Sequence, residues 1–349
     1  MKYLVRRIIA GFVLLSFMLC LVACGNVSVK DSETNDSRVV VDMSGNEITI
    51  PSEISTYAVA WAGLTDIVAM FDDFERCVAF PEKSTKFNLL FEFCPNLEGK
   101  QQLPDKGISA ESLINLNVQV VFLKGSDDED LNNKLKQCGI SVIDCEFQDY
   151  EGLEKVVNLI GETFGTEDTK QIADKYNKYI EEQVENANTI TSRIPDKDRL
   201  SAIVIRDTSD YSAFGQTRYT GKWVEICGAD YAMKNEDSYA NVNLTKEQLL
   251  EYDPDIIFFS MPGEAQKFLA DDSWSGMTAV QAGRVYNVPN GLNTWSNSGS
   301  ESALIFPWAQ SIMYPELVNY DINQVVRDYY AVFYSYDLTE PEIGAILNP

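Results

Sequence analysis

The sequence predicts an α/β fold of two similar lobes, each with a central, mostly parallel sheet flanked by helices, joined by one long α-helix. A segment with the pattern of a helix followed by a strand occurs twice, as SAESLINLNVQVVF from Ser109 and as TKEQLLEYDPDIIFF from Thr245. The two copies lie 136 residues apart. After each copy a helix is expected to end at a glycine, Gly139 or Gly283, before a strand follows. Between the copies, the segment 168–193 lacks proline and glycine and places apolar residues on one helical face.

The first 23 residues are expected to form a signal peptide and not a part of the fold. A basic start precedes an apolar run over 8–22, and Leu21-Val22-Ala23-Cys24 is similar to the lipobox of bacterial lipoproteins, in which the cysteine is lipidated. Residues 24–38 are polar and lack periodicity, which predicts a flexible tether. We therefore expect a protein that is lipid-anchored at Cys24 on the extracellular face of the cell membrane.

The N-terminal α/β lobe is predicted over 39–166. An alternating pattern about a Ser-Gly-Asn turn predicts a β-hairpin over 39–51. Strand and helix patterns then alternate, beginning with a strand at 56–61, a helix at 62–71 and a strand at 77–80. Such alternation is typical of an α/β architecture.

The connecting helix is predicted over 167–194 and the C-terminal α/β lobe over 195–349. In this second lobe the pattern restarts with a strand at 200–205 and a helix at 222–233, and the second copy of the repeat follows. A single rigid helix between two lobes limits how far they open and close. We therefore expect a shallow ligand groove between the lobes.

Each copy of the repeat opens its helix with an acid, Glu111 or Glu247. A local explanation suffices for one copy, because Thr245 and Gln248 fit a capping box. An acid in the first turn is also favoured by the free N–H groups and the helix dipole, by roughly 0.3–1 kcal/mol. The recurrence places an acid at the same position on both lobes, which capping alone explains less well.

Composition excludes several classes of function. A formal net charge of −25 argues against nucleic acid as a partner. The chain has no histidine, which excludes HExxH zinc chemistry and Ser-His-Asp hydrolysis, and it has no GxGxxG, Walker or GxSxG motif. We therefore predict no enzyme activity, no catalytic or metal-ligating residues and no resident cofactor. The cysteines after Cys24 have no metal-type spacing and do not imply a disulfide framework, and we expect all five to be buried small apolar residues: Cys77, Cys94, Cys138, Cys145 and Cys227.

Nearly the whole chain after the tether resembles the helical-backbone class of substrate-binding lipoproteins of ABC importers, which includes ferric-siderophore, haem, vitamin B12 and molybdate binders. Both copies of the repeat are similar to the family phrase in which a glutamate begins a helix that leads into a Pro-Asp strand, and WSGMTAVQAGRVYNVP resembles a further family element. The first copy departs from the phrase, with Asn117-Val118-Gln119 in place of Lys-Pro-Asp. The resemblance implies that Glu111 and Glu247 dock onto arginine pockets of the paired permease subunits.

In such a fold the loops that follow the strands line the groove, and here they carry aromatic rings and cations. The candidates are Trp61, Lys83 and Lys124 in the first lobe and Arg206, Tyr211, Phe214, Arg218 and Trp295 in the second, with Tyr219 and Tyr239 in the same loops. Rings stack on flat ligands and guanidinium groups bind carboxylates in bidentate fashion, so this mixture suits a flat or anionic chelate. The alternative is a core position for each aromatic residue and a solvated surface position for each cation.

The resemblance implies a binding protein that captures an iron chelate similar to a ferric siderophore and delivers it to a permease dimer with its ATPase. A corrinoid, haem or an oxyanion such as molybdate remains an alternative ligand within the same class. A stand-alone surface receptor or sensor subunit is the alternative outside it, and it would not need both acids. Because imidazole is absent, we expect any iron to arrive inside an organic chelator or to be held by tyrosine.

Overall fold

The computed structural model describes residues 37–87, 89–125, 129–233 and 241–349, and the chain divides into two units, Met1–Ser37 and Arg38–Pro349. Only the second unit is described below. The expected signal peptide, Cys24, most of the expected tether and Tyr239 lie outside the described residues.

The first lobe is built on a five-stranded sheet whose strands are all parallel, in the order β5-β4-β3-β6-β7. A separate two-stranded hairpin of β1 and β2 lies against β7, where Met43 N–H donates to the Asp144 carbonyl. The strands are β1 (Ser37–Val41), β2 (Glu47–Pro51), β3 (Tyr57–Val59), β4 (Cys77–Pro81), β5 (Gln101–Leu103), β6 (Val120–Leu123) and β7 (Ser141–Asp144). Since β3 and β6 are buried at every position, helices cover both faces of this sheet, as the parallel arrangement requires.

The helices of the first lobe are short, apart from α6. They are α2 (Thr65–Val68), α3 (Leu90–Phe93), α4 (Ala110–Asn115), α5 (Glu129–Gln137) and α6 (Tyr150–Phe164), with the 3₁₀ turns η1 (Ala62–Leu64), η2 (Glu82–Lys86) and η3 (Pro95–Leu97). Helix α6 begins at a cap in which Asp149 accepts from Gly152 N–H, and it ends at Gly165, whose φ of 73° is left-handed.

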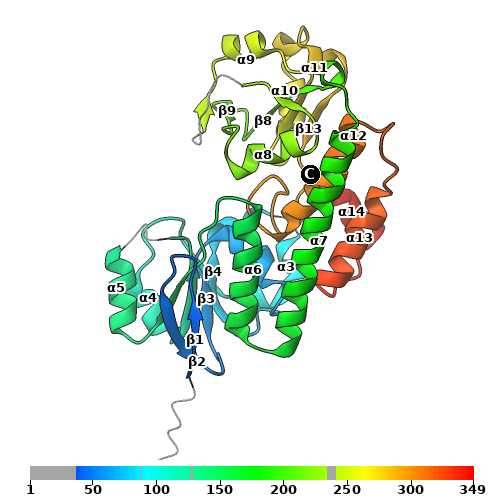
Figure 1. Ribbon diagram of the computed structural model, residues 1–349. Coiled ribbons are helices and arrows are strands. Elements are labelled where there is room, and N and C mark those ends of the chain that lie inside the picture. The colour runs from blue at the N-terminus through cyan, green and yellow to red at the C-terminus, as the bar shows by residue number, and fades with distance from the viewer. Residues whose placement is uncertain (1–36, 88, 126–128, 234–240) are drawn as a thin grey trace, which may run out of the picture. The chain divides into compact units, whose positions relative to one another are not determined.

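The second lobe has a mixed sheet in the order β11-β9-β8-β12-β13, and β10 also pairs with β8. Its strands are β8 (Ser201–Ile205), β9 (Ser212–Ala213), β10 (Asp230–Tyr231), β11 (Val242–Asn243), β12 (Ile256–Phe259) and β13 (Val285–Asn287). The central strands β8, β12 and β13 are parallel, whereas β9, near one edge, is antiparallel to both of its neighbours, β8 and β11. Figure 1 shows the two lobes and the helices around them.

The second lobe also holds most of the remaining helices. They are α8 (Tyr219–Ile226), α9 (Lys246–Tyr252), α10 (Glu264–Leu269), α11 (Thr278–Gln281), α12 (Ile305–Met313), α13 (Ile322–Phe333) and α14 (Glu340–Leu347), with η4 (Asp196–Asp198), η5 (Asp272–Trp274) and η6 (Ser300–Leu304). None of the described helices is long and apolar enough to cross a lipid bilayer.

The predicted repeat has the same structure in both lobes. Ser109 and Thr245 cap α4 and α9, and each side chain accepts from the N–H three residues later. Both helices are followed by a residue in the left-handed region, Asn117 (φ 52°) or Asp253 (φ 34°). The strands that come next, β6 and β12, lie between two parallel neighbours in their sheets. The two α/β lobes that the repeat predicted are therefore present.

The long helix is α7 (Glu167–Thr191), and it runs from one lobe to the other (Figure 1). It begins at a capping box between Thr166 and Thr169, and it buries Ala173, Tyr176 and Ile180. A Cβ on Gly161 of α6 would lie only 3.1 Å from the Thr169 carbonyl oxygen, so this glycine permits the close packing of α6 on α7.

The C-terminal helices also connect the lobes, which the sequence did not indicate. In α13, the Tyr329 ring lies 5.6 Å from the Tyr179 ring of α7, and the Tyr330 ring lies 5.1 Å from the Phe93 ring of the first lobe. Figure 1 shows α13 and α14 beside α7. These aromatic contacts add a second, noncovalent link between the lobes.

Two local predictions were wrong. The helix expected over 222–233 begins earlier and ends at Ile226, because Gly228 takes a left-handed φ of 93° and Asp230–Tyr231 pairs with β8. Four of the five cysteines are buried and free, but Cys138 is exposed, because it lies in the turn that follows α5.

Candidate ligand-binding cleft

A cavity of about 370 Å³ lies between the two lobes. Its walls are the loops that follow β3, β4, β5, β6 and β7 in the first lobe and β8, β9 and β12 in the second, together with the segment after β13. Apart from β9, these are the carboxyl ends of parallel strands, where ligands bind in open α/β sheets. The expected groove between the lobes is therefore present.

Trp61 is the main aromatic residue of the wall formed by the first lobe. Its ring lies 5.4 Å from the Phe147 ring, and the Lys124 ammonium lies 5.8 Å from the ring centre. A Cβ on Gly63 would come within 2.9 Å of the indole, so the absence of a side chain there leaves room for the ring. Trp61 thus borders the cleft in a position fixed by its neighbours.

Lysines from two loops add positive charge to this wall. Lys83 pairs with Asp105, and Lys124 lies 3.6 Å from Glu146. Lys86, also in η2, lines the same wall. All three lysine side chains follow the ends of β4 and β6.

Arginines provide the charge on the wall of the second lobe. Arg206 follows β8 and lies 3.4 Å from Asp207. Arg218 precedes α8, donates to the Asn241 side chain at 2.7 Å and lies 5.9 Å from the centre of the Phe214 ring. Tyr219 also lines the cleft, and burial raises the pKa of its phenol well above the usual range, so the phenol stays neutral.

The segment after β13 forms the floor of the cleft. Its side chains are short and polar, namely Asn293, Thr294, Asn297 and Ser298, and Ser260 after β12 lies among them. The Asn293 amide donates to the Ser298 carbonyl at 3.1 Å, which closes the loop on itself. The floor therefore offers hydroxyl and amide groups, whereas the walls offer charges and rings.

Six of the eight ligand-binding candidates line the cleft: Trp61, Lys83, Lys124, Arg206, Phe214 and Arg218. Trp295 does not, because it is 0% exposed and packs edge-on against Trp308. Tyr211 does not either, because at a left-handed φ of 47° its ring packs against Trp274, 5.3 Å away. The positions of these two residues do not support the ligand contacts expected of them.

Several lining residues were not among the sequence candidates, and these are Lys86, Phe87, Asp105, Glu146, Phe147, Asn241 and Ser260. Lys86 and Phe87 lie in the same loop as the candidate Lys83, so the rule about strand ends identified the loop but not these two residues. Phe147 follows the end of β7, and the same rule about strand ends could have found it.

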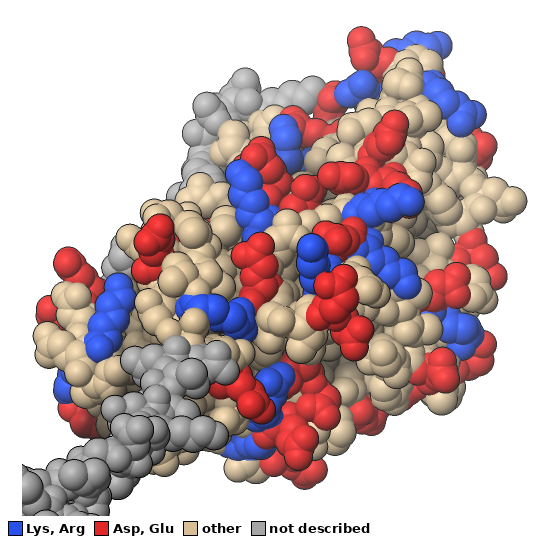
Figure 2. Space-filling view, turned by 60° about the horizontal axis from the view of Figure 1, so that its bottom comes forward, with Lys and Arg blue, Asp and Glu red and all other residues tan. Residues whose placement is uncertain are grey.

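The two repeated acids lie exposed on different lobes, each in the first turn of its helix. Lys134 donates to the Glu111 carboxylate and lowers the pKa of that carboxyl to about 2. Glu247 has no ion-pair partner within the part of the chain that the structure describes. On the face shown in Figure 2, acidic and basic side chains are interspersed, so this face offers no continuous basic patch.

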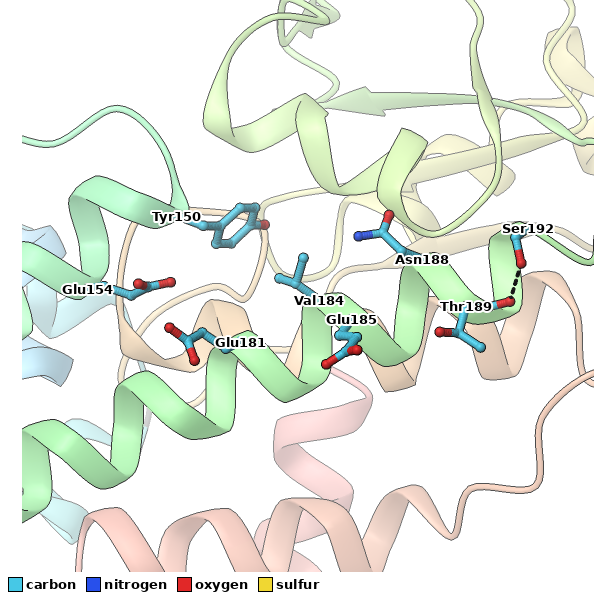
Figure 3. Close-up of a pocket in the computed structure, with 8 residues that line it drawn as sticks. All are labelled: Tyr150, Glu154, Glu181, Val184, Glu185, Asn188, Thr189 and Ser192. Carbon is cyan, nitrogen blue, oxygen red and sulfur yellow. Dashed lines mark hydrogen bonds between the residues drawn. The ribbon is translucent and has the colours of Figure 1, made fainter.

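A second hollow, of about 580 Å³, lies along α6 and α7 (Figure 3). Glu154, Glu181 and Glu185 line it, and no lysine or arginine does. Burial, with repulsion from Glu181, raises the pKa of Glu154. Although this hollow is larger than the cleft, it lies on the side of a helix pair and not at the strand ends. The cleft between the lobes is therefore the candidate site.

In the described ranges no group of three or more Cys, Asp or Glu side chains is arranged to hold a metal ion. The donors that line the cleft are hydroxyls, amides and cations, with Asp105 and Glu146 as the acids. Such a set suits an anionic, oxygen-rich molecule.

Residues 58–292 match the sequence pattern of a family described as periplasmic binding protein, which is more than half of the chain. The chain belongs to this family. The family resemblance seen in the sequence is therefore confirmed, as is the prediction that the protein is not an enzyme, since members of this family are substrate-binding transport proteins. Proteins of this class work with the permease and ATPase components of ABC importers.

Individual periplasmic binding proteins agree with this assignment. The ABC transporter substrate-binding lipoprotein YvrC of Bacillus subtilis is 23% identical over 294 residues, which cover 81% of this chain and 90% of YvrC. The Fe(3+)-citrate-binding protein YfmC of the same organism is 26% identical over 129 residues, or 35% of this chain and 39% of YfmC. The molybdate-bound MolA of Haemophilus influenzae shares the fold with a TM-score of 0.77 at 21% identity, over 86% of this chain and 99% of MolA.

Proposed function

We propose that this substrate-binding protein captures an anionic iron chelate in the cleft between its lobes and delivers it to a permease. The observation that carries the proposal is the charge of the cleft. Five basic side chains line it, namely Lys83, Lys86, Lys124, Arg206 and Arg218, against only two acidic ones, Asp105 and Glu146. The chain as a whole has a net charge of −25, so the cleft is a basic exception on an acidic protein.

The chemistry of the walls favours a chelate over a bare ion. Guanidinium groups on one wall can bind carboxylate or catecholate oxygens in bidentate fashion. The rings of Trp61, Phe87 and Phe214 offer apolar faces against which the organic part of a chelate can stack. A cavity of about 370 Å³ also lies toward the smaller end of small-molecule sites, about 300–1,000 Å³, and favours a compact ligand over a large macrocycle.

The names of the relatives are consistent with two kinds of anionic ligand. YfmC is named for ferric citrate, a carboxylate chelate, and MolA holds molybdate, an oxyanion. The floor of the cleft, with Asn293, Thr294 and Ser260, would also suit an oxyanion, because such an ion accepts hydrogen bonds from hydroxyls and amides. Molybdate is therefore the second candidate.

The proposal also includes the docking and anchoring roles. Glu111 and Glu247 occupy equivalent exposed positions on the two lobes, which fits a permease dimer with two equivalent sites. Cys24 would carry the lipid that holds the protein at the extracellular face of the cell membrane. The name of YvrC, which calls it a lipoprotein, is consistent with this anchor. A stand-alone receptor would keep the cleft but would not need both acids.

Tryptophan fluorescence tests the ligand and its location together. Ferric citrate should quench the emission, and Trp61→Phe should lose most of that quenching, because Trp61 is the tryptophan among the described residues that lines the cleft. Trp295→Phe is the matched control, since this tryptophan is buried, and it should keep the response. Trp61→Ala should weaken binding about five- to a hundredfold.

Molybdate and Zn²⁺ serve as comparison ligands in the same titrations, with calorimetry as a second measurement. Tight binding of molybdate without binding of ferric citrate would replace the chelate with an oxyanion. Tight binding of bare Zn²⁺, or quenching that survives in Trp61→Phe but disappears in Trp295→Phe, would contradict the proposed ligand and its site.

A further inference from the structure

Two buried acidic residues that do not line the cleft meet beside its floor, where the carboxylate of one contacts the backbone of the other. Asp66 lies in α2 of the first lobe and Glu301 lies in η6 of the second. Both residues are 0% exposed. The Asp66 carboxylate oxygen Oδ2 accepts from the Glu301 N–H at 3.1 Å and from the Ser300 hydroxyl at 3.2 Å. This contact therefore joins the two lobes at their junction.

The hydrogen bonds of the two carboxyl groups differ in number. Glu301 accepts from the N–H groups of Gly291, Leu292 and Asn293 at 3.0–3.3 Å, and also from the Tyr330 hydroxyl. Its two oxygens are thus fully supplied with donors, as an ionised carboxylate requires. Asp66 Oδ1, by contrast, has no hydrogen-bond partner among the described residues. Among the described residues, no donor therefore stabilises a negative charge on this oxygen.

No described lysine or arginine forms an ion pair with either carboxyl group. The ionisable groups whose charge acts on the pair from neighbouring elements are a thiol and phenols: Cys94 after α3, Tyr176 of α7, Tyr219 of α8, and Tyr329, Tyr330 and Tyr334 of α13 and its end. Burial raises the pKa of each of these groups, so all of them are neutral at physiological pH. Two buried negative charges would therefore face each other with no compensating cation.

The pair also holds the floor of the cleft. Asn293 lines the cleft, and its N–H is one of the donors to Glu301. Gly299, which follows the lining residue Ser298, passes so close to Asp66 that a Cβ there would lie 2.4 Å from Oδ2. A change of charge on either carboxyl group therefore acts on the backbone that forms the floor.

We propose that Asp66 and Glu301 share one proton at neutral pH and that this proton positions the cleft floor and the lobe junction, so that its loss at higher pH weakens ligand capture. Asp66 and Glu301 are positioning residues in this proposal and do not touch the ligand. When the proton leaves for solvent, two carboxylates remain in a site that water does not reach. Their repulsion is relieved by moving the floor segment or by separating the lobes. The binding part of the proposal rests on the function proposed above.

Protonation can be measured without any ligand. Burial raises the pKa of Asp66 from 3.8 to about 7 and, with repulsion from Asp66, that of Glu301 from 4.5 to about 8. A raised pKa in the folded state contributes stability that is full at low pH and is lost as the pH rises through the folded value. The melting temperature of the unmodified protein should therefore fall as the pH rises from about 5 to about 9, and Asp66→Asn should flatten that fall. Glu151→Gln, at an exposed carboxyl of α6, is the control and should keep the slope.

Infrared difference spectroscopy on the unmodified protein gives a second measurement, should Asp66→Asn fold poorly. The carbonyl stretch of a protonated carboxyl should disappear as the pH rises, and in Asp66→Asn this loss should occur at lower pH, because Glu301 no longer faces a second charge. Glu301→Gln should also reduce the pH dependence, because the remaining carboxyl stays buried but no longer faces a second charge. A melting profile and infrared spectrum that are the same in all of these variants would overturn the shared proton.

Binding of ferric citrate then tests the functional part. Because the ionisation of ferric citrate itself changes with pH, the measured quantity is a ratio. It is the dissociation constant of the unmodified protein divided by that of Asp66→Asn at each pH. This ratio should rise by up to about tenfold for each pH unit above the titration of the pair. A constant ratio, with the proton present in the infrared spectrum, would overturn the link to binding. Failure of ferric citrate to bind at any pH would contradict the proposed ligand and leave the shared proton to the ligand-free measurements.

Discussion

The two lobes share one helix and strand unit but differ in other strands of their sheets. In both, a capped helix, a left-handed residue and a buried strand follow in the same frame, at Ser109 to Leu123 and at Thr245 to Phe259. The sheet of the first lobe contains only parallel strands, whereas in the sheet of the second lobe β9 is antiparallel to both of its neighbours. The repeat therefore fixes the framework of each lobe, and the other strands give each lobe its own share of the cleft.

The lobes also contribute different cations. The first supplies lysines in pairs with Asp105 and Glu146, and the second supplies Arg206 and Arg218. A lysine acts as a point charge, while an arginine presents a planar fork that matches a carboxylate. The comparison suggests that the first lobe sets the general charge of the cleft and that the second orients the ligand.

The largest effect is expected from replacing these cations with alanine. The two lobes provide matched double variants. Arg206→Ala with Arg218→Ala and Lys83→Ala with Lys124→Ala remove the same charge. The arginine variant should bind ferric citrate about ten- to a hundredfold more weakly than the lysine variant, because it loses charged, bidentate hydrogen bonds. Calorimetry at one ionic strength measures the difference. Equal losses of affinity in both variants would mean that charge alone determines ferric citrate binding. The proposed difference between the roles of the two lobes would then be wrong.

A smaller effect is expected from the caps of the repeated helices. Thr245 forms a reciprocal capping box with Gln248, whereas Ser109 accepts a single bond from the Ser112 N–H. Thr245→Ala should lower the free energy of unfolding by about 1–2 kcal/mol and Ser109→Ala by about 0.5–1 kcal/mol. Urea denaturation measures both. Thr189→Ala, at an exposed position within α7, is the control and should change little, and a larger cost at Ser109 than at Thr245 would contradict this ranking.

The smallest effect on the isolated protein is expected at the docking acids. Glu111→Lys with Glu247→Lys should leave ligand affinity nearly unchanged, since both side chains are exposed and neither lines the cleft. Uptake by cells should nevertheless fall strongly, because the permease would meet repelling charges. Normal uptake in the double variant, or loss of ligand affinity before loss of uptake, would remove the docking role.

The single variants test whether the two docking acids, Glu111 and Glu247, contribute equally to uptake. Lys134 already pairs with Glu111, while Glu247 has no such described partner. Glu247 should therefore be able to pair with an arginine of the permease without first breaking an ion pair. For this reason Glu247→Lys should impair uptake more than Glu111→Lys. The reverse order would show that Lys134 does not compete with the permease.

The framework and most of the cleft could be predicted because their signals are local or repeated. Periodicity identified α7, and the phrase that recurs at Glu111 and Glu247 identified both lobes. Ligands bind at the carboxyl ends of parallel strands, and this rule predicted that Trp61, Lys124 and Arg206 would line the cleft. The rule gives the loop but not the direction of each side chain within it. Trp295 shows this limit, because it lies in a cleft loop while its ring is turned into the core against Trp308.

The sequence by itself determined the number of lobes, the helix between them and the segments that reach the cleft, since these depend on hydrophobic spacing and on caps that act over a few residues. Only the tertiary structure decided which rings line the cleft, that α13 also joins the lobes, and that Asp66 meets Glu301. Those two acids are 235 residues apart in the chain, and each is unremarkable in its own segment. Their burial and mutual repulsion exist only after the lobes pack together, because both depend on the exclusion of water by residues distant in sequence.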